Sequence, residues 1–322
     1  MKRIAIFICL LFTGFLLQAQ AKIGINGEID WEKFEFNARL SLDLFSAKVR
    51  LPAGRIQAEE ILREEYPRRV RPYLLALPVD SANTLGDWIS KRYYNIQKLD
   101  ALSLSAREVP PNLSPDLTTM NGSYIVSLFG LSSDLMEHSR AEELPRILNP
   151  VSAASYTGII ILADEPLPVH GRNSSALTLP CVLPRVWDAN MNLIYELNTI
   201  DPRRNLRPYE RSQDEPSALP RINMDEKLPR DRFLKNVVVR YVNPDKIFAS
   251  SPSGMDEELE RLVGPNPLRI LAREVYGLRP TDPVIDVEDA YTILANENNR
   301  RLLREGRVAI VLNKNVLKST GQ

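Results

Sequence analysis

Five short blocks in the second half of the sequence decide the predicted fold. They read YTGIIILAD at residues 156–164, LPRVWDANMNLIYE at 183–196, NPLRILAREVYG at 266–277, VIDVEDAYTIL at 284–294 and LLREGRVAIVL at 302–312. The apolar run inside the first block is typical of a buried strand. The later blocks alternate between extended segments and short helical segments. Together they predict one α+β domain built from two separated parts of the chain.

The first half of the chain predicts a separate unit. Residues 31–44 alternate apolar and polar side chains, which indicates a half-buried strand. Pro52 suits the first turn of a following helix, where its missing N–H costs little. We expect Pro67 to end that helix and residues 70–77 to form a second short one.

A hairpin completes the predicted first unit. Its strands are expected at residues 99–109 and 123–131, with the Pro-rich residues 110–120 as a long connection. The predicted fold class is therefore α+β, with two small mixed units that each contain a mostly antiparallel sheet with packed helices. The expected boundaries are residues 22–150 for the N-terminal unit and 151–322 for the C-terminal domain.

The C-terminal domain contains an insertion at residues 200–232. Five prolines lie among many charged residues there, and apolar residues are few. Prolines at that density remove backbone donors and prevent a regular element. The sequence therefore predicts an exposed excursion between the two halves of the domain.

The N-terminus has the pattern of a secretory signal peptide. Lys2 and Arg3 precede an apolar run at residues 4–17, and Ala19 and Ala21 suit a cut after Ala21. The run is shorter than the roughly 20 residues that span a bilayer, although retention as an anchor stays an alternative. No later stretch is long and apolar enough to span a membrane. We expect a periplasmic protein, with the outer-membrane periphery as a second location.

Composition restricts the partners. The chain has 41 basic and 41 acidic residues, and loss of Lys2 and Arg3 would leave it close to neutral. Such a balance argues against nucleic acid and against a strongly charged membrane-surface role. Cys181 is the one cysteine beyond the predicted leader, so no internal disulfide is expected.

The sequence supplies no catalytic, cofactor or metal constellation. His138 and His170 lack a second ligand at a suitable spacing and are interpreted as surface histidines. Cys181 is flanked by apolar residues and is interpreted as a small core residue. The acidic residues 225–226 and 256–258 lack the spacing of a calcium loop. No catalytic residue, cofactor-binding residue, metal ligand or cofactor is therefore predicted.

Two alternatives remain open. Asp164 and Glu165 end an apolar strand and are the best candidates for a carboxylate pair, as in an envelope-polysaccharide hydrolase or binder. Their competing interpretation is a turn at the end of the strand. A soluble periplasmic ligand-binding protein is the other alternative, and it would need a deep apolar pocket between the units.

The quoted blocks resemble a bacterial envelope family that groups small outer-membrane lipoproteins with the flagellar basal-disk protein. The resemblance covers roughly residues 156–312, with a looser likeness at Ala53, Ala58 and Leu62. The residues that carry it are Tyr156, Thr157, Gly158, Asp164, Pro184, Asp188, Tyr195, Tyr241, Gly264, Asn266, Pro267, Leu268, Ala272, Asp289, Ala290, Leu303, Gly306, Val308 and Val311. Unlike the usual lipid-anchored members, this chain has no cysteine at the predicted cleavage point.

The resemblance implies a non-enzymatic structural or assembly protein of the envelope that self-associates or docks on a larger periplasmic assembly, with the flagellar motor as one candidate. Its partners would be proteins, including further copies of itself. Contact is expected through the excursion at residues 200–232 and through exposed edge strands, since unpaired edges recruit other strands.

Overall fold

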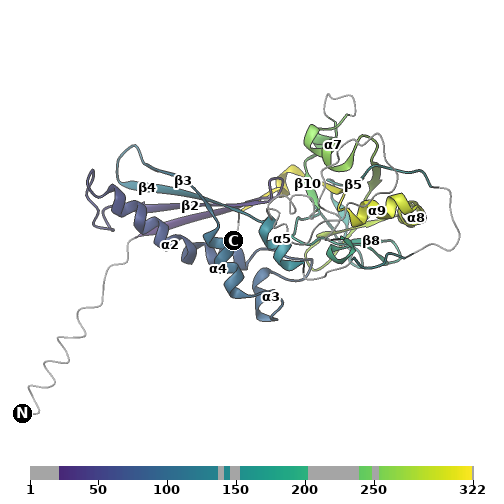
Figure 1. The fold of residues 1–322 in the computed structure, drawn as a ribbon, viewed down its shortest axis with the longest axis horizontal. Helices are drawn as coiled ribbons and strands as arrows, with labels where there is room; N and C mark the ends of the chain where they lie inside the picture. Colours follow the sequence, from purple (N-terminus) through teal and green to yellow (C-terminus); the bar gives the residue numbers. More distant parts are fainter. Residues whose placement is uncertain (1–21, 137–140, 146–152, 202–238, 249–253, 321–322) are drawn as a thin grey trace, which may run out of the picture.

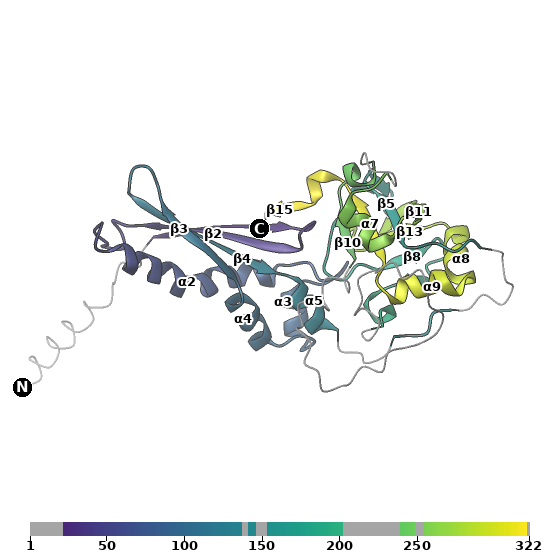
Figure 2. The same ribbon diagram turned by 45° about the horizontal axis from the view of Figure 1, so that its top comes forward.

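The computed structural model describes residues 22–136, 141–145, 153–201, 239–248 and 254–320. The molecule is elongated, with a sheet-and-helix unit at one end and a more compact unit at the other (Figures 1 and 2). It contains both helices and mixed sheets, which confirms the α+β class.

The first unit is built on a five-stranded antiparallel sheet in the order β15-β1-β2-β4-β3. The predicted half-buried strand at residues 31–44 is confirmed as β2, but the neighbouring β1 was not predicted. The strands are β1 (Ile23–Asp30), β2 (Glu35–Asp43), β3 (Arg107–Leu113), β4 (Thr119–Ser127) and β15 (Lys318–Thr320).

One long helix, α2 (Arg55–Leu75), covers one face of this sheet (Figure 2). The prediction that Pro67 ends the helix is wrong, because α2 continues through both Pro67 and Pro72. A single stripe of buried residues runs along its whole length, and packing of that stripe on the sheet outweighs the lost backbone hydrogen bonds. The stripe consists of Ala58, Leu62, Tyr66, Val70 and Leu74.

The predicted hairpin exists, but its boundaries differ. The residues expected to begin its first strand instead form helix α4 (Ile96–Leu104). Two of the three prolines expected in a long connection, Pro110 and Pro111, lie inside β3. They are tolerated because β3 is the edge of the sheet and has a register shift at that point. Two shorter helices complete the unit: α3 (Leu85–Ser90) and α5 (Phe129–Leu135).

The central sheet of the second unit is parallel, in the order β10-β14-β5-β11. The prediction of a mostly antiparallel sheet is therefore wrong for this unit. The two central strands are apolar and buried on both faces, as a covered parallel sheet requires, whereas the edge strand β11 alternates buried and exposed residues. They are β5 (Ile159–Ala163), β10 (Arg240–Val242), β11 (Leu268–Leu271) and β14 (Val308–Leu312).

Helices close both faces of the parallel sheet. Helix α7 (Glu257–Val263) packs on one face with its own small core. Helices α8 (Val287–Ala295) and α9 (Glu297–Arg304) contribute to the main core, which is continuous with that of the first unit. Within the five quoted blocks, the buried strand at β5 and the later extended and helical segments are confirmed, at β11 and β14 and at α8 and the end of α9.

A second, mixed sheet in the order β12-β13-β8-β9 lies beside the parallel one. Its β8–β9 hairpin lies in the quoted block at residues 183–196. The remaining elements are β6 (Leu167–Pro168), β7 (Ser175–Ala176), β8 (Val186–Asp188), β9 (Leu193–Tyr195), β12 (Glu274–Tyr276), β13 (Asp282–Ile285), η1 (Leu197–Thr199), η2 (Pro244–Ile247) and η3 (Lys314–Val316).

Two of the blocks that decided the predicted fold meet where β5 and β11 begin. Thr157 Oγ1 donates to the carbonyl of Val263 at 2.8 Å and accepts from the N–H of Asn266 at 3.0 Å. A Cβ on Gly158 would lie 2.3 Å from the Val263 carbonyl oxygen, so only glycine allows this approach. These residues therefore join the two halves of the domain.

The last described strand crosses the expected boundary between the units. β15 belongs to the end of the chain but pairs with β1 of the first sheet, at Glu28 to Asp30. The predicted excursion at residues 200–232 lies outside the described residues, except for its first two positions.

Candidate functional site

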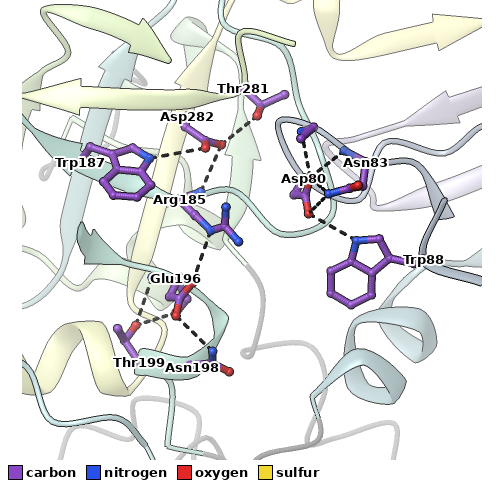
Figure 3. Close-up of polar contacts among 11 residues, drawn as sticks. Asp80, Asn83, Trp88, Arg185, Trp187, Glu196, Asn198, Thr199, Thr281 and Asp282 are labelled. Carbon is purple, nitrogen blue, oxygen red and sulfur yellow. Dashed lines mark hydrogen bonds and ion pairs between the residues drawn. The ribbon is translucent and has the colours of Figure 1, made fainter. Parts of the chain in front are cut away.

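Polar side chains gather where a loop of the first unit, residues 77–84, contacts the second unit (Figure 3). Two backbone hydrogen bonds tie the loop to the second unit, from Val182 N to the Pro78 carbonyl at 3.0 Å and from Leu183 N to the Val79 carbonyl at 2.7 Å. We call this contact the unit junction. It brings together four buried polar residues: Asp80, Ser81, Thr281 and Asp282.

Asp80 organises the first-unit side of the junction. Its buried carboxylate accepts hydrogen bonds from the backbone N–H groups of Ala82 at 2.8 Å and Asn83 at 2.7 Å. The Asn83 amide and the Trp88 indole also donate to it, the latter at 3.3 Å (Figure 3). These bonds fix the turn before α3. The acceptor capacity of Asp80 is thus used in building the loop.

Asp282 is the corresponding group on the second-unit side. It is almost fully buried and accepts from the Thr281 hydroxyl at 2.8 Å, the Arg185 N–H at 3.4 Å and the Trp187 indole at 3.5 Å (Figure 3). Burial raises the pKa of the Asp282 carboxyl above its ordinary value, and the hydrogen bonds that it accepts oppose that rise. Asp282 joins β13 to the chain leading into β8.

An ion pair lies on the same side. Arg185 Nε is 3.4 Å from Glu196 Oε2, and the Asn198 amide donates to Glu196 at 3.1 Å (Figure 3). The Thr199 hydroxyl donates a hydrogen bond to the Glu196 backbone carbonyl at 2.6 Å. These contacts cap the short helix η1 after β9, so they too are structural in their geometry.

A third contact between the units joins Ser81 of the first unit to Gly277 and Arg279 of the second. The Arg279 N–H donates to the Ser81 carbonyl at 2.9 Å. Gly277 lies against the Ser81 side chain, and a Cβ at Gly277 would be 2.4 Å from the Ser81 Cβ. Ser81 and Gly277 are far apart in the chain, so sequence spacing does not reveal this contact. The glycine at position 277 is the one local sign of a close approach.

His170 has a partner that sequence reasoning missed. It is half-buried, and its Nδ1 lies 2.5 Å from Glu274 Oε2. Its ring also packs edge-on against Tyr276, which in turn packs against Trp187. In the part of the chain that the structure describes, no nucleophilic side chain hydrogen-bonds to His170. The arrangement is a charge-assisted pair beside two aromatic rings. The other histidine, His138, lies outside the described residues.

Cys181 lies in the core, as predicted. It is fully buried, and burial raises the pKa of its thiol well above the ordinary value. The Tyr241 hydroxyl donates to the Cys181 carbonyl at 2.9 Å and accepts from its N–H at 3.2 Å. A buried, protonated thiol is a poor nucleophile.

The carboxylate pair of the hydrolase alternative lies away from the unit junction. Asp164 follows β5, and its backbone carbonyl accepts from the Asn313 amide at 3.1 Å. Its neighbour Glu165 is exposed, in the turn before β6. The side-chain carboxyls of Asp164 and Glu165 form no hydrogen bond and no ion pair with any other described residue. The structure therefore brings no third residue to this pair.

Among the described residues, no helix combines the length and apolarity needed to cross a bilayer. In the same part of the chain, no three His, Cys, Asp or Glu side chains gather in a way that could hold a metal ion.

Family models match both units. Residues 22–134 match the model described as Treponema pallidum Tp0624, N-terminal domain, and residues 225–314 match the model of its second domain. The chain thus resembles two consecutive domains of Tp0624. No curated protein matches it with significance. The matched models name neither the small outer-membrane lipoproteins nor the flagellar basal-disk protein.

The two Tp0624 matches divide the unit junction. The loop at residues 77–84 falls in the first match, and Asp282 falls in the second. Between the matches lie β5, β8 and β9, with Arg185 and Glu196. The Tp0624-like domains of this chain are therefore joined by residues from both matches and from the segment between them.

Proposed function

We propose that this chain is an exported, non-enzymatic structural or assembly protein of the bacterial cell envelope. The observation that carries the proposal is the use made of its buried polar groups. Asp80, Asp282 and Glu196 each accept hydrogen bonds that hold a turn, a strand or a helix end at the unit junction. Groups committed in this way build a rigid body, whereas a catalytic site keeps at least one polar group directed at its substrate.

The second junction between the units supports the same proposal. Trp31 packs edge-on against Tyr241, with ring centroids 6.1 Å apart, and its indole donates to Ser319 of β15 at 3.1 Å. Arg240 lies over the ring of Phe129 at 4.8 Å, which adds a cation–π contact between the units. With β15 completing the first sheet, the two units are interlocked at several points. Such a body suits a spacer or scaffold better than a hinged enzyme.

An exposed strand edge offers a site for a protein partner. β15 pairs with β1 only at Glu28 to Asp30, and no other described strand pairs with residues 23–27 on that side. The Asp43 N–H bonds the Lys22 carbonyl, so the N–H groups of alternate residues, including Ile25, point away from β2. The Tyr73 hydroxyl of α2 donates to the Ile25 carbonyl at 3.5 Å, so this edge is partly covered. The backbone groups that stay unpaired suit the addition of an extended segment of a partner or of a second copy.

Affinity capture from envelope extract tests the proposal, with the tag placed at the C-terminus so that export is undisturbed. We expect wild-type protein to retain defined envelope proteins, or further copies of itself. We expect Ile25→Pro to lose them, because proline there removes an outward N–H and leaves the ladder to β2 intact. The half-buried Ile25 side chain packs against the core, so circular dichroism checks that the variant is folded. Asn26→Pro is the matched control: it removes a ladder bond to β2 and should lower the unfolding free energy.

The outcomes separate two claims. Capture that is unchanged by Ile25→Pro would place the partner elsewhere on the surface. Failure of the wild-type protein to retain any envelope component, or itself, would contradict the assembly role.

The flagellar motor is a finer proposal, and its support is the sequence resemblance alone. It requires basal-body proteins among those captured. A capture that contains only other envelope components would exclude it.

A further inference from the structure

The free edge of β1 carries its outward backbone groups in a symmetric pattern. These groups belong to Ile23, Ile25 and Gly27, because the residues between them bond β2. The next outward position, Ile29, is already paired with Ser319 of β15. Among the described residues, the free stretch is therefore 23–27, and Ile25 lies at its centre.

An antiparallel copy of this stretch matches it group for group. When Ile25 of one copy lies opposite Ile25 of another, Ile23 lies opposite Gly27 and Gly27 opposite Ile23. Each of these pairs then exchanges two backbone hydrogen bonds, as in an ordinary antiparallel ladder. A two-fold axis through Ile25, perpendicular to the sheet, generates this arrangement and places both α2 helices on the same face.

Helix α2 presents one of its two flanks to this edge. On one flank, Arg63 pairs with a glutamate of β3 and Arg71 with an aspartate of α4. On the other flank, the Tyr73 hydroxyl reaches the Ile25 carbonyl of β1. Residues four apart lie on the same side of a helix. The flank that faces β1 therefore consists of Ile61, Glu65, Arg69 and Tyr73, all of them half-buried.

The same two-fold axis passes the middle of that flank. Helix α2 and β1 run in the same direction, toward the second unit (Figure 2). Tyr73 leans back over β1, since a Cβ on Gly27 would lie 2.7 Å from its ring. With rises of about 1.5 Å per helical residue and about 3.3 Å per strand residue, Pro67 lies roughly level with Ile25. The axis therefore exchanges residues equally far from position 67.

Opposite charges meet across the axis. Glu65 of each copy faces Arg69 of the other, and Tyr73 of each copy faces Ile61 of the other. Helix α2 contacts β1, β2 and β4, so it lies over β2, and the two helix axes are three strand spacings, about 14 Å, apart. Arginine and glutamate side chains are long enough to meet across that distance. Glu65 and Arg69 also pair within each copy at 3.1 Å, so the four charges alternate along the seam.

We propose that two copies of this chain pair through the edge of β1 and form a symmetric dimer with one continuous antiparallel sheet. The proposal rests on the assembly role and narrows the partner at this edge to a second copy. Two independent features assign that occupant, because the backbone groups of β1 and the charges of α2 are self-complementary about the same axis. An unrelated extended segment supplies the backbone bonds but brings no second α2 flank.

Charge reversal on α2 tests the proposal in a chain that begins at Lys22 and keeps every described residue. Sedimentation velocity over a concentration series should show a wild-type dimer. Glu65→Arg and Arg69→Glu should each weaken dimerisation about tenfold, because like charges then face each other at two symmetric places. The double variant Glu65→Arg with Arg69→Glu should restore the dimer, since opposite charges face each other again.

Glu59→Arg is the matched control. Glu59 pairs with Arg55 at the same four-residue spacing, but it lies four residues before Arg63, on the flank that faces β3. This variant should remain a dimer, and circular dichroism should show equal folding of all variants. Equal weakening in Glu59→Arg, or no restoration in the double variant, would overturn the proposal. A wild-type protein that stays monomeric over the whole series would overturn it too.

Spin labels test the geometry of the pairing. Asn26 is exposed on the open face of β1, and in the dimer it lies opposite Gly24 of the second copy. Nitroxides on Asn26→Cys should therefore broaden each other's spectrum, at roughly 8 Å between the two Cα atoms. Nitroxides on Asn121→Cys of β4 should not, because five strand spacings, about 24 Å, separate them. Buried Cys181 does not take the label.

The outcomes separate this proposal from the assembly role. A dimer without broadening at position 26 would place the interface elsewhere and overturn the pairing through β1. A monomer that still captures other envelope proteins would overturn the dimer and leave the assembly role intact. A dimer with broadening at position 26 that captures no other protein supports the pairing and confines assembly to copies of this chain.

Discussion

Strand β2 of the first unit and strand β5 of the second are both apolar, but they use their side chains differently. In β2, Leu40 is buried against α2 while its neighbours Arg39 and Ser41 lie on the other, more open face. In β5, Ile160 belongs to the small core under α7 and Ile161 to the main core on the opposite face. One sheet is covered on one side and the other on both.

This difference in coverage decides which sheet has backbone and side chains accessible to a partner. The parallel sheet of the second unit is enclosed, so its strands serve stability. The sheet of the first unit keeps one face and part of one strand edge accessible. The contact proposed at the edge of β1 lies on this unit.

The largest expected effect is a loss of stability when neighbouring residues of β5 and β2 are changed to alanine. Ile160→Ala and Ile161→Ala should each lower the unfolding free energy by about 2–5 kcal/mol, because both side chains are buried and each leaves a cavity. In β2, Leu40→Ala should cost as much, but Ser41→Ala should change stability by less than about 0.5 kcal/mol. Chemical denaturation of the four variants measures this. A small loss in either isoleucine variant would contradict a sheet covered on both faces.

The sequence predicted these elements unevenly, for physical reasons. The alternation around Leu40 and the apolar run around Ile160 are local signals, and both strands were found. The continuation of α2 through Pro67 was missed because tertiary packing of its buried stripe overrode a local rule. The parallel direction of β5, β11 and β14 was missed because strand direction depends on pairing between distant segments.

The candidate sites show the same limit. Absence of a nucleophile motif could be read from the sequence, and so could the core position of Cys181. The His170–Glu274 pair and the contact of Ser81 with Gly277 join residues from distant segments, so no spacing rule could find them.

A glycine at the unit junction gives the next largest effect. Gly277 has φ 122°, and an added Cβ would lie 2.4 Å from both the Arg279 carbonyl oxygen and the Ser81 Cβ. We expect Gly277→Ala to lower the unfolding free energy by roughly 1–3 kcal/mol through backbone strain, and to loosen the contact between the units. Hydrogen exchange at Arg279 N–H, which bonds the Ser81 carbonyl, should become faster.

Gly171→Ala is the control for that experiment. Gly171 has φ 73° but nothing within 4 Å of an added Cβ, so only the conformational cost of about 1 kcal/mol should appear. Exchange at Arg279 should stay unchanged in this variant. Equal effects of the two substitutions would mean that the approach of Gly277 to Ser81 does not hold the units together.

The smallest effect is a difference in pH dependence between two aspartates on the two sides of the junction. The pKa of Asp282 is raised in the folded protein, mainly by burial, so ionisation opposes folding. The stability of wild-type protein relative to Asp282→Asn should therefore be greatest below the ordinary carboxyl pKa and fall as pH rises through the higher folded pKa. The slope can reach at most about 1.4 kcal/mol per pH unit.

Asp87 should show the opposite sign. Hydrogen bonds from Thr84 at the start of α3 lower the pKa of Asp87. Its stabilising contribution is present above the ordinary carboxyl pKa and is lost as pH falls through the lower folded pKa. Thermal unfolding of Asp282→Asn and Asp87→Asn across the acidic range measures both trends against wild-type protein. If stability changed with pH in the same direction for both variants, the pKa of Asp282 would not be raised by burial. Asp282 would then not be a buried carboxyl at the unit junction.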